Sequence, residues 1–327
     1  MMIVGGGRID VHFHAVPAFF REAAAAAGRR PAISSGLPAW SPELALDVMD
    51  RHGIATAILS LSQPGVHFGD DAAARTLARR CNAYVAECGA AAPGRFGGFG
   101  VLPLPDVAGA RAEAVHVLDD LKLDGIVLFA SCGDRFLGDP LFDPVLELLD
   151  ERGAVVFVHP ALHPSVAALA LDLPAFAIEY PFDTTRAATN LIFSGALDRF
   201  ANIRFIIAHA GGTLPFLASR LAASPLIDPG RLGTRSPAYV LEKIKHFWYD
   251  TALAYGPQAI ATLNAVANPD RILFGSDWPY APEAVTATSV ASLRDPATVP
   301  EAQQHAIERG NAERLFPKGR FMIEGTP

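Results

Sequence analysis

Cysteine is scarce in this chain: only Cys81, Cys88 and Cys132 occur, and no two of them form a CxxC pair. An odd number of cysteines without such spacing suits a reducing cytosol better than a disulfide framework. Cys81 and Cys88 lie two helical turns apart, which favours shared packing in a core.

Long apolar segments and clustered positive charges are also missing. No uninterrupted apolar run approaches the roughly 18 residues of a membrane span, and no charged region followed by a long apolar stretch marks a secretory signal. Charged residues make up 19% of the chain, the net charge is -7, and there is no Lys/Arg run of the kind that binds nucleic acid. We therefore expect a soluble, cytoplasmic protein with no membrane or nucleic-acid partner.

Short apolar runs alternate with longer helical patterns along most of the chain. With 327 residues and 50% hydrophobic content the chain can build a large core, and we expect one domain over residues 1–327. The apolar runs are continuous in Val, Ile, Leu and Phe, which is typical of parallel strands buried on both faces. The predicted strands are Arg8–Phe13, Ile54–Leu61, Arg95–Val101, Gly125–Phe129, Ala154–Val158, Ile203–Ala208, His246–Thr251 and Arg271–Phe274.

Eight strands alternating with helices predict an α/β fold, the (β/α)8 or TIM barrel. The alternative is an open doubly wound sheet, but no glycine-rich dinucleotide loop follows the first strand. An N-terminal insertion rich in Pro and Gly separates the first strand from a helix over Pro42–His52, for which Ser41 is the expected N-cap. After the fifth strand, the prolines of Pro160–Pro181 predict an irregular cap over the barrel mouth, before a helix near Thr184–Arg199.

Histidine and aspartate end four of the eight predicted strands. His12 and His14 lie at positions i and i+2 of the first strand, so their side chains project from one face. The fifth strand ends in His159, the sixth in His209 and the eighth in Asp277. The carboxyl ends of barrel strands form the active-site rim, so these five side chains come together there. Each alone has an ordinary role as a rim residue or turn former, but in combination they predict a divalent-cation site.

The other histidines fit ordinary roles. Three fall in helical patterns, where surface or capping positions suffice: His52, His116 and His305. His246 begins the seventh strand, at the end opposite the active site. His67 and His163 lie in loops near the rim, and His163 is a candidate substrate contact.

Several segments together resemble the amidohydrolase superfamily. They are His12-Phe-His14, His159-Pro160, the His209-Ala-Gly-Gly segment running to Pro215 and Arg220, Pro181-Phe-Asp-Thr-Thr-Arg186, and Phe274-Gly-Ser-Asp277-Trp-Pro. In combination they are similar to the branch that contains aminocarboxymuconate-semialdehyde decarboxylase and the γ-resorcylate and 6-methylsalicylate decarboxylases. The resemblance covers nearly the whole chain. It is greatest for the 6-methylsalicylate type, through Trp40-Ser-Pro-Glu, Thr56-Ala-Ile-Leu-Ser-Leu-Ser and His209-Ala-Gly-Gly-Thr-Leu-Pro.

The resemblance implies roles for individual residues. The implied metal ligands are His12, His14, His159 and Asp277. His209 would be an acid/base group beside the metal, and Arg220 would reach the pocket of a neighbouring subunit in a homodimer. One metal ion is expected, Zn²⁺ or Mn²⁺, with no organic cofactor, because the lysine that bridges two metals in binuclear relatives has no match. The aminocarboxymuconate enzyme has an arginine before the segment matching Trp40, where this chain reads Ser35-Gly-Leu-Pro-Ala39, which argues against its substrate.

The implied activity is carboxy-lyase chemistry, the non-oxidative loss of CO₂ from an ortho-hydroxy aromatic carboxylate. Asp277, or a group relayed through His209, would deliver the proton to the ring carbon. Hydrolysis is the alternative, because the same ligands can activate water against a lactone or an amide. A barrel that holds metal without turnover is a third possibility. The aromatic residues expected around the substrate, for each of which core packing is the ordinary alternative, are Phe19, Trp40, Phe129, Phe182 and Trp278.

Overall fold

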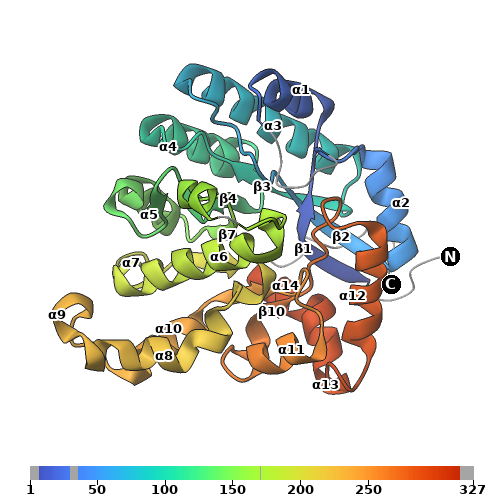
Figure 1. The fold of residues 1–327 in the computed structure, drawn as a ribbon. Helices are drawn as coiled ribbons and strands as arrows, with labels where there is room; N and C mark the ends of the chain where they lie inside the picture. Colours follow the sequence, from blue (N-terminus) through green and yellow to red (C-terminus); the bar gives the residue numbers. More distant parts are fainter. Residues whose placement is uncertain (1–6, 30–35, 170, 317–327) are drawn as a thin grey trace.

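Eight parallel strands form the centre of the computed structural model, which describes residues 7–29, 36–169 and 171–316. Helices surround the strands on the outside (Figure 1). In sheet order the strands are β1 (Arg8–His14), β2 (Ile54–Ser60), β3 (Phe96–Val101), β4 (Gly125–Phe129), β7 (Val155–His159), β8 (Arg204–Ile207), β9 (Trp248–Asp250) and β10 (Ile272–Leu273). The predicted TIM barrel is therefore confirmed, and each predicted strand matches an observed one within a few residues.

The barrel closes between its first and last strands. Three backbone hydrogen bonds join β1 to the segment that directly follows β10. They run from Val11 N to Phe274 O at 3.0 Å, from Asp277 N to His12 O at 2.8 Å, and from His14 N to Trp278 O at 2.8 Å. These hydrogen bonds hold the backbone of Asp277 directly beside that of His12.

The strands are buried on both faces, as their continuous apolar sequences predict. Every residue of β1, β2, β3 and β7 is buried. Phe157 of β7 contacts His12 of β1, with ring centroids 4.8 Å apart, and Phe99 of β3 at 5.7 Å. These three strands are not neighbours in the sheet, so the contacts cross the barrel interior. The ring of His12 therefore packs against an apolar aromatic floor, formed by Phe157, inside the barrel.

The helices alternate with the strands along the chain. Their bounds are α1 (Ala18–Ala26), α2 (Pro42–His52), α3 (Asp71–Ala91), α4 (Val107–Val115), α5 (Asp143–Glu151), α6 (Ala175–Phe193), α7 (Ala196–Arg199), α8 (Leu214–Ile227), α9 (Pro229–Leu232), α10 (Pro237–His246), α11 (Pro257–Asn264), α12 (Glu283–Arg294), α13 (Glu301–His305) and α14 (Asn311–Leu315). The Ser41 hydroxyl accepts a hydrogen bond from Leu44 N at 3.2 Å, which confirms it as the N-cap of α2. Among the described residues, no helix is both long and apolar enough to cross a membrane.

Two elements differ from the sequence-based expectation. The cap after the fifth strand is not irregular throughout, because α6 begins at Ala175 and continues through Pro181. The helix predicted over Thr184–Arg199 therefore starts nine residues earlier, and Gly195, at a left-handed φ of 75°, separates its end as α7. His246 does not begin a strand but ends α10, because Val240 and Ile244 form a buried helical stripe that carries the helix to that point.

Candidate metal centre

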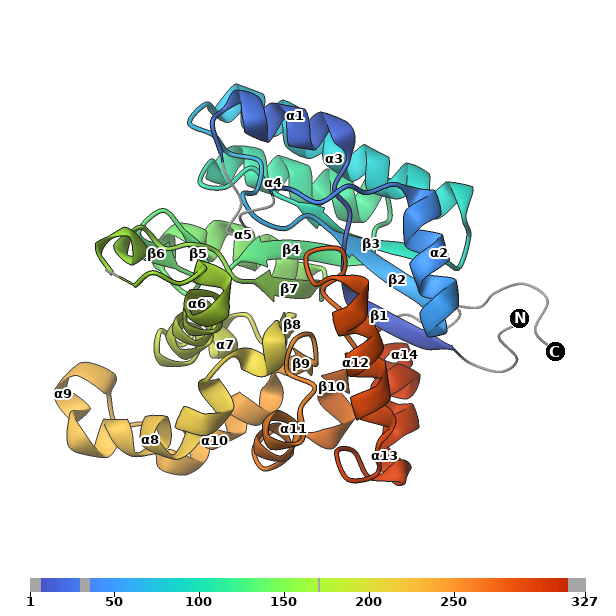
Figure 2. The ribbon, with the colours of Figure 1, turned by 45° about the vertical axis from the view of Figure 1, so that its right-hand side comes forward.

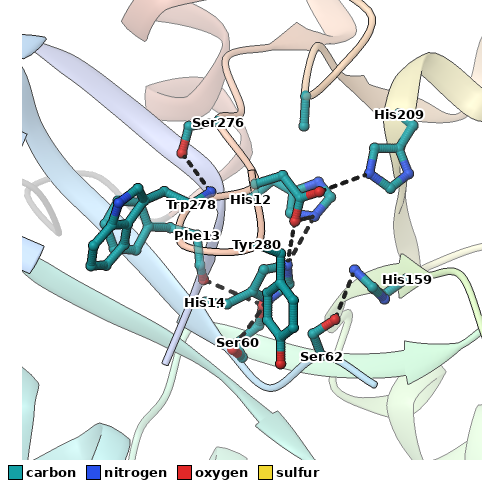
Figure 3. A network of polar contacts seen from close by, with 12 residues as sticks. His12, Phe13, His14, Ser60, Ser62, His159, His209, Ser276, Trp278 and Tyr280 are labelled. Carbon is teal, nitrogen blue, oxygen red and sulfur yellow. Dashed lines mark hydrogen bonds and ion pairs between the residues drawn. The ribbon is translucent and has the colours of Figure 1, made fainter. Parts of the chain in front are cut away.

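Four side chains converge at the carboxyl ends of the strands. Three of them, His12 and His14 from β1 and His159 from the end of β7, are labelled in Figure 3. The fourth is Asp277, from the segment after β10. One nitrogen or oxygen of each lies within 4.8 Å of the others, and all four residues are buried. The structure thus brings together the four residues that the sequence analysis gave as metal ligands.

The spacing of the inward-facing atoms suits a shell around one cation. The Nε2 atoms of His12 and His14 are 3.1 Å apart, and Asp277 Oδ1 lies 2.9 Å from His14 Nε2 and 3.3 Å from His12 Nε2. Metal–nitrogen and metal–oxygen bonds of about 2.0–2.2 Å put neighbouring ligands of one ion roughly 3.0–3.5 Å apart. His12, His14 and Asp277 are therefore already spaced as ligands of a single ion, and the ligand atom of His159 lies within 4.8 Å of theirs.

The outer nitrogen of each of the three histidines is held by an acceptor. His12 Nδ1 lies 2.9 Å from Asp250 Oδ2, His14 Nδ1 lies 3.3 Å from the backbone oxygen of Ser60, and His159 Nδ1 lies 2.9 Å from the carbonyl of the next residue. An acceptor at Nδ1 keeps the proton there and leaves the Nε2 lone pair facing the centre. Three such imidazoles and one carboxylate fit Zn²⁺ and Mn²⁺ alike.

The charges of the site are strongly coupled. Burial opposes ionisation of Asp277, but the positive charge on His12 and hydrogen bonds from the surrounding histidines outweigh it and hold the pKa of Asp277 well below its usual range. Burial alone would lower the pKa of His12, but the carboxylates of Asp250 and Asp277 raise it to about 10. Burial lowers the pKa of both His14 and His159. The carboxylates of Asp250 and Asp277 thus favour a positive charge at the centre of the cluster.

His209 stands beside this cluster. Its Nε2 lies 3.4 Å from Asp277 Oδ2, the carboxylate oxygen not shared with His14. Its Nδ1 is buried and has no hydrogen-bond partner within the described part of the chain. His209, Ala210 and Asp277 all have left-handed backbone angles, with φ of 55°, 54° and 62°. Such angles are costly for non-glycine residues and persist where the surrounding fold imposes them, often at functional sites.

Asp250 is an important residue that the sequence analysis did not single out. Besides His12, its carboxylate accepts hydrogen bonds from the backbone nitrogens of His209 at 3.0 Å and Ala252 at 2.9 Å. It orients a metal ligand and the neighbouring acid/base group together. Asp250 ends β9, the seventh strand of the barrel, as other site residues end their strands. The rule that polar residues at strand ends form the site could therefore also have identified Asp250.

Asp10 was missed as well. Its Oδ1 accepts from the backbone nitrogens of His12 at 3.0 Å and Ser276 at 3.2 Å, which joins β1 to the segment carrying Asp277. Burial raises the pKa of Asp10 to about 7. Asp10, His12 and His14 alternate along β1, so the two-residue period of the strand already places Asp10 on the same face.

The predicted substrate-contacting residues are dispersed. Phe19 and Trp40 both pack edge-on against Tyr84 of α3, with ring centroids 5.8 and 5.9 Å away. Trp278 packs against Phe13, at 4.9 Å. Trp40 and Trp278 are buried and Phe19 is half-buried.

Three further candidates lie outside the ligand cluster. His163 stacks on Phe136 at 4.8 Å, Arg220 lies exposed on α8, and Phe182 is 39% exposed on α6. Phe129 contacts a metal ligand, with its ring 6.2 Å from that of His159. It also lines a cavity of about 620 Å³ at the carboxyl ends of β2, β3 and β4.

The comparisons with known proteins agree with this geometry. The sequence pattern of the family described as Amidohydrolase matches residues 9–318. The chain is 39% identical to a 6-methylsalicylic acid decarboxylase of Aspergillus aculeatus, over 98% of this chain and 99% of the relative. It is 38% identical to a decarboxylase of Aspergillus niger, over 95% and 88%. The fold is similar to that of a dihydroxybenzoic acid decarboxylase from a Polaromonas species, whose crystal structure contains bound manganese and the inhibitor 2-nitroresorcinol. The two structures superpose with a TM-score of 0.80 at 25% sequence identity, over 95% of this chain and 97% of that one. The chain therefore belongs to the amidohydrolase family.

Proposed function

We propose that this protein is a metal-dependent decarboxylase of an ortho-hydroxy aromatic carboxylate such as 6-methylsalicylate or a resorcylate. The observation that carries the proposal is the buried cluster of three imidazoles and one carboxylate, at the strand ends of a chain 39% identical to a 6-methylsalicylic acid decarboxylase over nearly its whole length. Such a site takes an anionic, oxygen-rich substrate without an organic cofactor.

A divalent cation, Zn²⁺ or Mn²⁺, would be held by the four ligand side chains. When bound, it supplies a Lewis acid that orients neighbouring carboxylate and hydroxyl oxygens and favours the phenolate form. The ligands of the protein contribute preorganisation, because their outer hydrogen bonds hold the inner atoms in place before any substrate arrives. The apolar floor formed by Phe157 removes water from beneath the site and strengthens these electrostatic interactions.

Loss of CO₂ from an aromatic ring needs a proton at the ring carbon. Protonation at the carboxyl-bearing carbon of a phenolate gives a dienone, from which CO₂ departs while the ring regains its aromatic electrons. Asp277 is the proposed donor, and His209 resupplies it through the 3.4 Å contact between Nε2 and Oδ2. Because the pKa of Asp277 lies below its usual range, its carboxyl is ionised at rest and holds the proton only during transfer.

The test is CO₂ release from salicylate, 6-methylsalicylate and 2,6-dihydroxybenzoate by protein loaded with Zn²⁺ or Mn²⁺. We expect turnover that stops on chelation and returns when the metal is restored. The alternative function is hydrolysis of a lactone or amide of a small carboxylated substrate, since the same cluster can activate a water molecule. Turnover of such compounds without CO₂ release from any aryl acid would favour hydrolysis instead.

We also propose that the protein works as a homodimer through α8. This helix carries three strongly exposed apolar side chains, Phe216 at 81%, Leu226 at 69% and Ile227 at 80%, next to the exposed Arg220. Figure 2 shows α8 and the adjoining α9 at the outer edge of the molecule. Such a concentration of apolar surface is typical of an interface. Light scattering on the metal-loaded protein tests this, and a fully active monomer would contradict it.

A further inference from the structure

Ser62 follows the end of β2 and has no role in the chemistry described so far. It belongs to the Ser60-Leu-Ser62 sequence, in which the two serines lie two residues apart. The Ser60 hydroxyl lies 3.0 Å from the outer nitrogen of His14, Nδ1, behind the metal site. The Ser62 hydroxyl lies 3.3 Å from the inner nitrogen of His159, Nε2, which faces the metal site (Figure 3). The two serines thus contact metal ligands from opposite sides.

The contact of Ser62 cannot persist when a cation is bound. His159 Nδ1 donates to the carbonyl of the next residue, so Nε2 is the acceptor and Ser62 is the donor. The single lone pair of Nε2 can serve a hydroxyl or a cation but not both. Ser62 is only 3% exposed, so its hydroxyl needs another acceptor once the metal is in place.

The position of Ser62 indicates which acceptor this is. The next residues, Gln63, Pro64 and Gly65, line the 620 Å³ cavity together with Phe129. Ser62 therefore contacts a metal ligand on one side and adjoins, through the next residue, a cavity large enough for a small aromatic molecule. We propose that Ser62 donates a hydrogen bond to an oxygen of the carboxylate–hydroxyl pair of the substrate, and so selects aryl acids that present this pair; the inference rests on the proposed function.

One protein group competes as acceptor. The Tyr280 hydroxyl donates to the backbone oxygen of Gln63, the residue after Ser62, at 3.3 Å, and Ser62 lowers the pKa of Tyr280 against the larger effect of burial, which indicates that the two hydroxyls interact. If Ser62 served only to hold Tyr280, it would be a positioning residue without substrate contact. A double-variant cycle separates the two roles, because the effect of losing Ser62 then depends on Tyr280.

The experiment compares S62A with S60A in metal-loaded protein, using salicylate as the probe. Binding is measured by calorimetry, metal content by mass spectrometry, and kcat and KM from CO₂ release. A lost hydrogen bond to a charged acceptor weakens binding about 10- to 100-fold. We therefore expect S62A to lose about tenfold or more in salicylate affinity with unchanged metal content, and S62T to recover most of it. S60A is the matched control: His14 Nδ1 loses the Ser60 hydroxyl but keeps the backbone oxygen, so we expect metal binding to weaken by no more than about 10-fold, with wild-type salicylate affinity at saturating metal.

The outcomes are separable. Wild-type salicylate affinity in S62A, loss of metal from S62A, or no salicylate binding by the loaded wild-type protein would each overturn the inference. The inference would also be overturned if S62A did not lower salicylate affinity further in the Y280F variant, since Ser62 would then act through Tyr280. Binding needs no turnover, so Ser62-dependent binding without CO₂ release would refute the proposed function alone. Release of CO₂ with unaltered S62A binding and KM would refute this inference alone.

Discussion

Replacing Asp250 by asparagine tests the tautomer on which metal binding depends. Asp250 Oδ1 accepts the two backbone bonds, from His209 and Ala252, and an asparagine oxygen can accept them equally well. The change falls on Oδ2, which faces His12 Nδ1 at 2.9 Å and becomes an amide NH₂ in the variant. Two donors would then face each other, unless the imidazole moves its proton to Nε2, where it blocks the metal.

The expected effect is large for metal and small for the fold. Loss of an outer partner of a metal-binding histidine typically costs about 10- to 100-fold in metal affinity, which is about 1.4 to 2.8 kcal/mol. The assay is a titration of metal-free protein with Zn²⁺ or Mn²⁺ against a competing chelator, with circular dichroism to confirm folding. Unchanged affinity in folded D250N protein would refute the tautomer argument.

D10N is the matched control for this experiment. Asp10 is buried on the same strand face, but its Oδ1 accepts only from backbone nitrogens and its Oδ2 has no partner within the described residues. Its pKa of about 7 means that the neutral form is already accessible near neutral pH. We expect metal affinity within about threefold of wild type in D10N, because no imidazole tautomer depends on this carboxyl. A loss in D10N as large as in D250N would show that any buried charge change disturbs the site.

Three further predictions follow from the geometry. D277N should abolish CO₂ release while the fold is retained, since the amide cannot carry the proton; near-normal turnover would remove Asp277 as the donor. Metal affinity should rise with pH, by up to about tenfold per unit below pH 10, because a cation must displace the proton of His12, whose pKa is raised to about 10. Calorimetry in buffers of different ionisation enthalpy should detect about one proton released per metal ion bound. A metal affinity that does not change with pH would contradict this prediction. G212A should lower the free energy of unfolding by about 3 kcal/mol or more in urea titrations, because Gly212 has a φ of 63° and its new Cβ would lie 2.1 Å from Pro181 O; wild-type stability would contradict the observed packing.

The barrel and most of its metal centre could be predicted because they follow from short-range patterns. His159 and Asp277 were identifiable because each ends a buried apolar run, and topology then brings the ends of such runs together. The spacing of His12 and His14 gave their common face directly. Asp250 obeys the same rule but ends a strand of only three residues, so its position as a strand end stands out less in the sequence.

Other features depend on tertiary contacts that no local pattern contains. Pro181 reads as a helix breaker, yet α6 continues through it, and the Thr185 hydroxyl donates to the Pro181 carbonyl at 2.7 Å. Phe19 and Trp40 are candidate pocket residues, and the fold packs both against Tyr84 of α3. The sequence identified these residue types without fixing the direction in which their side chains point.

The hydrogen bonds between β1 and the segment after β10 have a consequence for folding of the chain. The ligands at positions 12 and 277 come from opposite ends of the chain and meet only when the last strand has docked on the first. Metal binding is therefore coupled to closure of the barrel, and a cation at 100 times its dissociation constant adds about 2.7 kcal/mol to the closed form. A chain that lacks the last strand would carry the three histidine ligands without the carboxylate of Asp277. Tight metal binding therefore follows closure of the barrel, and the bound ion links the two ends of the chain.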